Sequence, residues 1–240
     1  MRYTRYARSV LALALGFSAT ALMAPATHAQ IPSGWQAFTD GTNDYTVRSD
    51  VARREGGQGY AGVTIKSNVE SPRGTGMLAQ SIRADAYRGK RVRLSGYLKG
   101  IGINEGTAEI WMRVDGDGVV QTSDYMQDRP LMGTRDWKRE EIVLDVPSNA
   151  IGITFGFLLS GSGQVWLDDL QVEIVGDDVP VTGKKGGLYP DAGTRYTATE
   201  LVRRRRDQEI AYRRVPTEPL NLALRPSVSG MTVATVVRAP

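Results

Sequence analysis

Residues 91–98 read Arg-Val-Arg-Leu-Ser-Gly-Tyr-Leu, so polar and apolar side chains alternate along them. Successive side chains of a strand point to opposite faces, and such alternation is typical of a strand with one buried face. An α-helix would instead repeat its apolar positions every three or four residues. The stretch therefore predicts a half-buried β-strand.

Further strands with the same period follow along the chain, separated by turns rich in Gly, Asp, Ser and Pro. The clearest lie at residues 108–114, 141–146, 151–159 and 165–174, and earlier ones are expected at residues 45–49, 61–67 and 76–82. Short strands at this spacing, with almost no helical pattern, predict an antiparallel β-sandwich over residues 30–175.

The first 29 residues have the composition of a secretory signal peptide. Arg2, Arg5 and Arg8 precede an apolar run over residues 10–26, and Thr27-His28-Ala29 predicts cleavage after Ala29. The run is short for a membrane span and is interrupted by Gly, Ser, Thr and Pro, so the mature chain is expected to lack a transmembrane segment. We therefore predict a secreted or periplasmic bacterial protein.

Charge and composition narrow the function of the mature chain. Removal of three arginines lowers the formal charge from +4 to nearly neutral, which argues against a nucleic-acid partner. The chain has no Cys, and its single His lies in the signal peptide. Ser-His-Asp and Cys-His nucleophiles, His/Cys zinc sites and disulfides are thereby excluded.

Paired carboxylates are the remaining route to hydrolysis, at Glu140-Glu141 or Asp168-Asp169. Adjacent strand residues point to opposite faces, so neither pair can flank one glycosidic bond. We expect no enzymatic activity, and a hydrolase is the least favoured reading.

Residues 176–240 form a more basic tail that begins with a linker-like composition. A helix is expected near residues 197–214, with Thr199 as its cap. Its run Arg203, Arg204, Arg205 and Arg206 has two interpretations. It is either a solvated helix face followed by partial disorder, or an anion-binding patch that recruits a partner, including a protein.

Several motifs carry a family resemblance. They include Gly89-Lys90-Arg91-Val92-Arg93-Leu94-Ser95-Gly96-Tyr97, the strand around Trp111, and Val165-Trp166-Leu167-Asp168-Asp169-Leu170. Together they resemble the galactose-binding-like jelly-roll modules of bacteria, which are similar to carbohydrate-binding modules and occur alone after a signal peptide or attached to regulators and hydrolases. The likeness spans residues 34–175. The usual Asn-Leu-Gly-Phe-Glu start is missing before Gly34, although residues 221–224, Asn-Leu-Ala-Leu, faintly resemble it.

The resemblance implies a ligand site on a concave face, and strand parity suggests where it lies. Ile110, Met112 and Val114 share the predicted inner face, so Trp111 and Arg113 are expected to point outward. Sugar rings stack on exposed aromatic faces, although the same residues also fill sandwich cores. The loop after this strand adds further candidates for ligand binding: Tyr125, Gln127, Asp128 and Arg129.

Asp168 suggests a metal site. It falls on the predicted core face with Trp166 and Leu170, where a bare carboxylate is costly. In resembling modules an aspartate at this place often binds a structural Ca²⁺, and Asp40, Asp44 and Asp50 are available to complete it. The alternative is that Asp168 pairs with an arginine or caps a turn. No other cofactor is expected.

The sequence therefore predicts an exported, non-catalytic binding module for a carbohydrate or another cell-envelope ligand. The alternative is a structural or protein-interaction module that acts through its basic tail.

Overall fold

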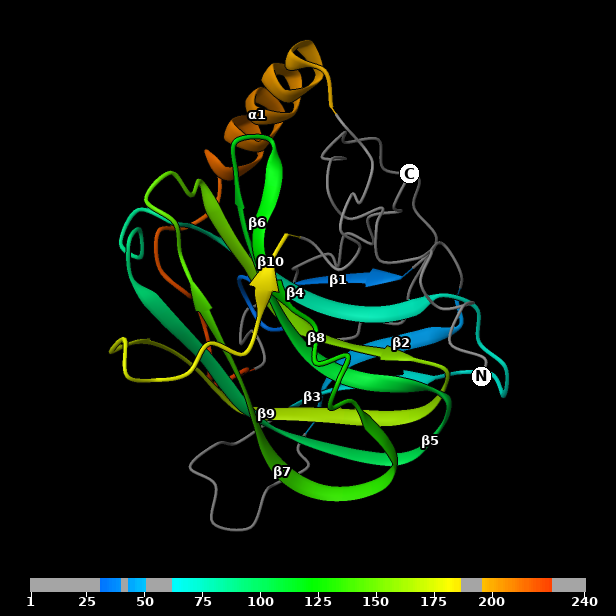
Figure 1. The fold of residues 1–240 in the computed structure, drawn as a ribbon. Coiled ribbons are helices and arrows are strands. Elements are labelled where there is room, and N and C mark those ends of the chain that lie inside the picture. Colours follow the sequence, from blue (N-terminus) through cyan, green and yellow to red (C-terminus); the bar gives the residue numbers. More distant parts are fainter. Residues whose placement is uncertain (1–30, 40–42, 51–61, 187–195, 226–240) are drawn as a thin grey trace.

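The computed structural model describes residues 31–39, 43–50, 62–186 and 196–225. They form an antiparallel β-sandwich of the jelly-roll kind with one helix, which confirms the predicted fold class (Figure 1). The elements in chain order are β1 (Gln36–Thr39), β2 (Tyr45–Asp50), β3 (Gly62–Ser67), β4 (Thr75–Arg83), β5 (Arg91–Gly116), β6 (Val119–Asp124), β7 (Leu131–Asp145), β8 (Gly152–Ser160), β9 (Ser162–Val175), β10 (Lys184–Lys185) and α1 (Ala198–Tyr212).

The long strand β5 connects the two layers of the sandwich. Its second half pairs with β8 on one side and β6 on the other, which gives the layer β1-β4-β8-β5-β6-β10. Its first half pairs with β9 and β7, which gives the layer β2-β3-β9-β5-β7. Two motifs that the sequence analysis treated separately, residues 91–98 and 108–114, are thus parts of one bent strand.

The main core lies between the layers and follows the predicted alternation. Ile110 and Met112 of β5 lie beside Phe157 and Phe155 of the neighbouring strand β8. All four side chains are fully buried. Every residue of β8 is buried, on both of its faces. A strand that is covered on both faces reads as a continuous apolar run rather than as an alternating one.

The predicted core face of β9 is wrong at Trp166 and Asp168 and correct at Leu170, because a bulge shifts the parity of the strand between them. Val165 and Leu167 are in the core, and so is Leu170. Between them, Asp169 takes a left-handed backbone (φ 51°), and the register against β5 changes by one residue. Trp166 and Asp168 consequently lie on the face opposite the core.

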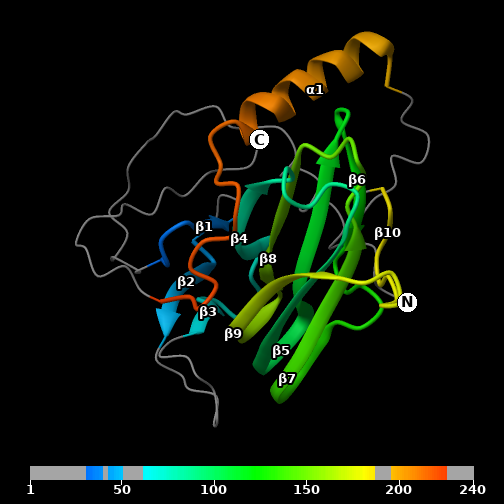
Figure 2. The ribbon, with the colours of Figure 1, turned by 90° about the vertical axis from the view of Figure 1, so that its left-hand side faces the viewer.

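Residues 196–225, the described part of the chain around and after α1, pack on the sandwich. The helix α1 begins after Thr197, which caps it in a capping box with Glu200, so the cap is two residues earlier than predicted. Figure 2 shows α1 crossing one end of the sandwich and the following chain descending beside β4 and β1. Backbone bonds join Arg83 to Pro216, and Leu224 is fully buried in the main core.

The segment 221–224, Asn-Leu-Ala-Leu, forms a turn and not a strand, and Leu224 and Leu222 contact the main core. Trp35 Nε1 donates to Asn221 O at 3.3 Å, and Gln80 exchanges two hydrogen bonds with the backbone of Leu220.

Among the residues that the structure describes, no helix is long and apolar enough to span a membrane.

Candidate functional site

A second cluster of side chains covers the face of the β1-β4-β8-β5-β6 layer that points away from the main core. The strand register places Met77, Leu158 and Glu109 in one row of this face. Ala79, Gly156 and Trp111 form the next row, and Ser81, Thr154 and Arg113 form the third. We call this surface the Trp111 face.

Trp111 and Tyr125 form the aromatic centre of this face. Their rings are stacked, with centroids 5.6 Å apart and planes inclined by 8°. The prediction that Trp111 lies on the face opposite Ile110 and Met112 is confirmed, but the prediction that it is exposed is wrong. Only 1% of Trp111 and 7% of Tyr125 is accessible, and both rings pack with Met77, Ala79 and Leu158 in one buried apolar cluster.

The indole N–H of Trp111 is buried and has no hydrogen-bond acceptor within the described part of the chain. Two other indoles differ: Trp35 Nε1 donates to Asn221 O and Trp166 Nε1 donates to Asp50 Oδ2 at 2.9 Å. A buried donor without an acceptor costs stability, and nearly all buried polar groups in proteins are paired. Trp111 thus offers a free donor at the centre of its face.

Arg113 lies beside the aromatic pair in a buried ion pair. Its Nε is 3.1 Å from Asp115 Oδ2, and at most a tenth of either side chain is accessible, so Arg113 is not the exposed residue that was predicted. Burial lowers the pKa of Arg113, but Asp115, together with smaller contributions from Tyr212 and Tyr125, outweighs burial, and the pKa is raised overall. Arg113 therefore stays charged and anchors this end of the face.

Tyr212 of α1 closes that end. Its hydroxyl donates to Asp115 Oδ2 and also contacts Thr154 Oγ1 at 2.8 Å. Burial, followed by the charge of Asp115, raises the pKa of Tyr212 far above its usual value. The ring lies directly over Gly152, where a Cβ would collide with it. The C-terminal helix is thereby locked to the Trp111 face.

Glu109 lies at the opposite, partly exposed margin of the face. Its Oε1 accepts a hydrogen bond from the Thr107 hydroxyl at 2.7 Å, and Thr107 in turn contacts Ser160. Burial raises the pKa of Glu109 to about 7, with a smaller contribution from Asp124, although the Thr107 hydroxyl acts to lower it. This margin presents two hydroxyls and a carboxyl that titrates near neutrality.

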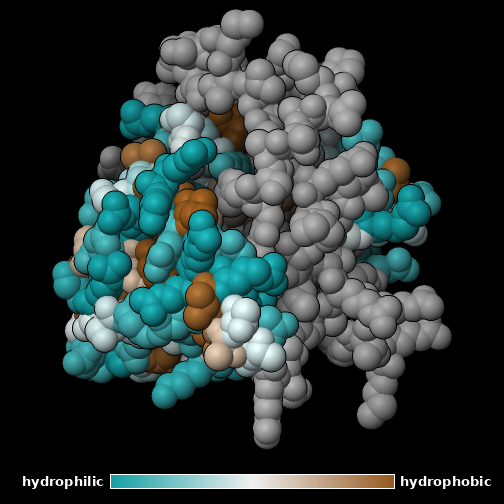
Figure 3. All heavy atoms as spheres, turned by 90° about the horizontal axis from the view of Figure 1, so that it is seen from above, coloured by the Kyte–Doolittle hydropathy of each residue, from teal (hydrophilic) through white to brown (hydrophobic). Residues whose placement is uncertain are grey.

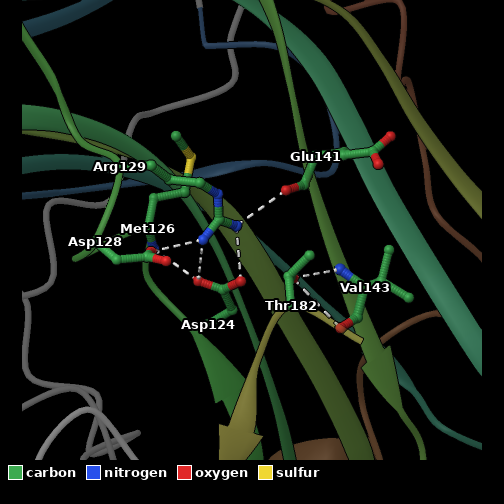
Figure 4. A network of polar contacts seen from close by, with 7 residues as sticks. All are labelled: Asp124, Met126, Asp128, Arg129, Glu141, Val143 and Thr182. Atoms are coloured by element: carbon green, nitrogen blue, oxygen red, sulfur yellow. Dashed lines mark hydrogen bonds and ion pairs between the residues drawn. The ribbon is translucent and has the colours of Figure 1, made fainter. Parts of the chain in front are cut away.

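The loop after β6 has a structural role at two of its four predicted ligand positions, Asp128 and Arg129. Arg129 donates to Asp124 Oδ2 at 2.7 Å, to Asp128 Oδ1 at 2.8 Å and to Glu141 O at 3.0 Å (Figure 4). Asp124 also accepts from Met126 N, which fixes the turn. Gln127 is exposed beside this network. Only Tyr125 joins Trp111, while Asp128 and Arg129 brace the loop.

The predicted calcium ligands do not form one group. Asp40 lies outside the described residues. Asp50 is bound by Trp166, and Asp44, at the other end of β2, accepts a hydrogen bond from Arg73 N at 2.9 Å. Asp168 Oδ1 accepts from Asp169 N, as a turn-capping carboxylate does. The described residues hold no group of three acidic or imidazole side chains that could bind a metal.

The four arginines of α1 divide between two sides of the helix. Arg204 Nε donates to Gly118 O at 2.7 Å and its guanidinium lies 4.1 Å from the Tyr196 ring centroid. Arg205 pairs with Glu209 at 3.3 Å and lies 3.5 Å from Asp117. Arg203 and Arg206 are exposed. Two of the four arginines, Arg204 and Arg205, thus contact the turn between β5 and β6 of the sandwich.

Sequence reasoning missed Glu109, Asp115 and Tyr212. The first two were within its reach, because they stand two positions from Trp111 and Arg113 on the same strand face. Tyr212 gave no such signal, since it meets Asp115 across a sequence separation of 97 residues.

Comparison with known proteins gives one relative in sequence and several in fold. No family model matches the chain. The chain is 40% identical over 152 residues to the uncharacterized HTH-type transcriptional regulator YbfP of Bacillus subtilis, a match that covers 62% of this chain and 50% of YbfP. The chain thus spans about half the length of this curated relative.

The solved structures similar to the chain have low sequence identity. The CBM22-1 xylan-binding domain of Paenibacillus barcinonensis Xyn10C is 17% identical, with a TM-score of 0.43, over 59% of this chain and 86% of that domain. TmCBM61 in complex with β-1,4-galactotriose is 18% identical, with a TM-score of 0.40, over 61% and 92%. The Stig cyclase Fisc of Fischerella sp. TAU is 13% identical, with a TM-score of 0.44, over 63% and 90%.

Proposed function

We propose that this chain is an exported, non-catalytic binding module that takes a carbohydrate, or a similar polyhydroxylated ligand of the cell envelope, on the Trp111 face. The observation that carries the proposal is the buried indole N–H of Trp111, which has no acceptor in the described part of the chain. A ligand hydroxyl that reaches the indole when the side chains covering it move aside would supply that acceptor and remove the cost of leaving the donor unpaired.

The surroundings of Trp111 suit such a ligand. Carbohydrates combine apolar C–H faces with many hydroxyls, and binding sites for small molecules combine apolar walls with a few fixed polar groups. Phe38, Thr107 and Glu109 are partly exposed, so they form the margin at which a ligand would enter. The Trp111–Tyr125 stack is the apolar floor, and Glu109 supplies an acceptor for hydroxyls.

The carboxylates near this face favour binding over hydrolysis. Asp115 is occupied by Arg113 and Tyr212, and Asp124 by Arg129 and Met126 N. Six residues of strand separate Glu109 from Asp115, about 20 Å. Glycosidases need two carboxyl groups within about 10 Å of one another. Glu109 therefore has no evident catalytic partner on this face.

The comparisons offer ligands for a first test. One similar structure is described as xylan-binding and another contains β-1,4-galactotriose. The half-length match to a transcriptional regulator fits a ligand-binding unit that can be attached to other domains. Xylo-oligosaccharides and galactotriose are therefore suitable members of an oligosaccharide panel.

The test is calorimetric titration of the chain with this panel, using Trp111→Phe and its matched control Trp166→Phe. Both variants lose an indole, but the Trp166 N–H is already bound to Asp50. We expect Trp111→Phe to weaken binding about tenfold, the value of one hydrogen bond, and Trp166→Phe to leave it unchanged. Circular dichroism melts confirm that both variants fold.

Two results would overturn the proposal: no binding by the wild-type chain to any member of a broad panel of plant and bacterial glycans, or equal weakening in the two folded variants. Glu109→Gln serves as a second probe. Its effect on affinity should appear only above about pH 7, where the wild-type carboxyl is ionised.

A further inference from the structure

The outward side of α1 is built differently from the side that packs on the sandwich. At about 100° per residue, Val202, Arg206, Ile210 and Arg213 fall within an arc of roughly 80°, and Arg203 lies at its edge. Leu201, Gln208 and Tyr212 lie on the opposite side. We call the residues Val202, Arg203, Arg206, Ile210 and Arg213 the outer face of α1.

Three arginines make this outer face cationic, and Glu209, which lies as near to one edge of the arc as Arg203 lies to the other, is paired with Arg205. Arg203, Arg206 and Arg213 are exposed, and none forms an ion pair with a carboxylate that the structure describes. The acidic residues of the helix lie outside the arc, and two of them have other roles. Glu200 belongs to the capping box, and Glu209 pairs with Arg205.

The outer face also exposes two aliphatic side chains among its arginines. Val202 is 70% accessible and Ile210 is 49% accessible. In Figure 3, which looks down on this end of the molecule, separate apolar residues stand out in a mainly hydrophilic surface. Exposed aliphatics between cations gain nothing from a hydrophilic polyanion, but they gain from entering the boundary between lipid headgroups and acyl chains.

The orientation of the outer face is fixed by the contacts on the other side of the helix. Gln208 accepts from Gly118 N at 2.8 Å and donates to Val119 O at 3.1 Å, and Arg204 donates to Gly118 O. Tyr212 anchors the end of the helix on Asp115. The arginines are therefore presented together, away from the sandwich, without further ordering of the helix.

We propose that the outer face of α1 docks this protein on an anionic phospholipid surface. Each arginine near such a surface contributes electrostatic attraction, and its long apolar stem lets Val202 and Ile210 approach the acyl region. This inference does not depend on the proposed carbohydrate site, because the Trp111 face is formed by other residues. It would hold a binding module beside a membrane with its sandwich directed away from the lipid.

The test is flotation of the full chain with vesicles of phosphatidylcholine alone and of phosphatidylcholine mixed with phosphatidylglycerol. One variant carries Arg206→Gln and Arg213→Gln, a second carries Val202→Ser and Ile210→Ser. The matched control carries Lys184→Gln and Lys185→Gln, two exposed lysines of β10. Residues 1–29 are the same in all of them, so differences between variants report on α1.

We expect binding only to the anionic vesicles. The arginine variant should bind roughly 30-fold more weakly, from about 1 kcal/mol per arginine, and the aliphatic variant several-fold more weakly. The lysine control should bind nearly as the wild type. Equal weakening in the arginine variant and the lysine control would show a net-charge effect and overturn the proposal. Failure of the wild-type chain to bind anionic vesicles would also overturn the proposal. If both the wild type and the aliphatic variant then bound heparin or duplex DNA, the outer face would be a site for hydrophilic polyanions instead.

Discussion

Trp111 and Trp166 lie at comparable places in the two layers of the sandwich, but their indole N–H groups differ in hydrogen bonding. Each lies on the strand face opposite the main core. Trp166 is 9% accessible and its N–H is bound by Asp50, so the protein itself completes its hydrogen bonding. Trp111 is 1% accessible, and its N–H has no acceptor in the described part of the chain.

This difference is the basis of the proposal that Trp166 is a structural tryptophan and that Trp111 binds a ligand. Burial alone does not make the distinction, because the more deeply buried ring has the free donor. The Trp111 face also keeps an ion pair, a titrating carboxyl and a stacked tyrosine within one surface. Unpaired donors and buried charged groups lower the stability of a protein, and natural proteins keep such features mainly at functional sites.

The largest expected effect comes from breaking the ion pair that anchors the Trp111 face. Asp115→Ala leaves Arg113 buried and charged, and removes the acceptor of the Tyr212 hydroxyl. We expect a loss of about 3–5 kcal/mol in the free energy of unfolding, measured by urea denaturation. Asp136→Ala removes an exposed partner of Lys99 and should cost less than about 1 kcal/mol. Similar losses in the two variants would contradict the structure.

A smaller loss of stability is expected when the indole N–H of Trp166 is left without an acceptor, as that of Trp111 is among the described residues. Asp50→Ala removes the acceptor of the Trp166 N–H. We expect it to cost about 1–2 kcal/mol in unfolding free energy, because the indole is largely buried. Asp44→Ala, just before the same strand, is the matched control, since the bond that its carboxylate accepts among the described residues comes from an exposed backbone N–H. A neutral Asp50→Ala would mean that the two tryptophans do not differ in this respect.

The carboxyl of Glu109 makes the stability of the Trp111 face depend on pH. The pKa of this glutamate is raised by burial from its ordinary 4.5 to about 7. The folded state therefore holds the proton more tightly, and this stabilising difference is present below pH 4.5 and is lost as the pH rises through 7. Glu109→Gln does not titrate, so it should match the wild type at pH 4 and be more stable by up to about 3 kcal/mol at pH 8, at about 1.4 kcal/mol per pKa unit. Thermal melts at the two pH values check this, and an equal stability difference at both would contradict it.

Local alternation was sufficient to predict much of the fold. The period of two located the strands of the sandwich and the side of β5 on which Trp111 lies. It did not show whether that side is open to solvent, because this depends on side chains from β4 and β8. The run Phe157-Leu158-Leu159 held a clue, since a strand that is apolar at successive positions is covered on both faces.

Two features could not be predicted from local pattern. The bulge at Asp169 reverses the parity of β9 because one residue takes a left-handed backbone. The sequence Asp168-Asp169 does not by itself predict such a bulge. The end of the site depends on Tyr212, whose position follows from where α1 docks. Composition suggested a loose basic tail, whereas Gln208, Tyr212 and Leu224 are buried against the sandwich.

The indole N–H resonances provide the most direct test of the central claim, that the Trp111 face is a ligand site completed by a ligand hydroxyl. The measurement is a ¹⁵N–¹H spectrum of the tryptophan side chains during titration with β-1,4-galactotriose, xylo-oligosaccharides and any further ligand found in the panel. The account predicts that the Trp111 N–H signal moves downfield on binding while the Trp166 signal stays in place. A bound oligosaccharide that moves the Trp166 signal and leaves the Trp111 signal unchanged would contradict it.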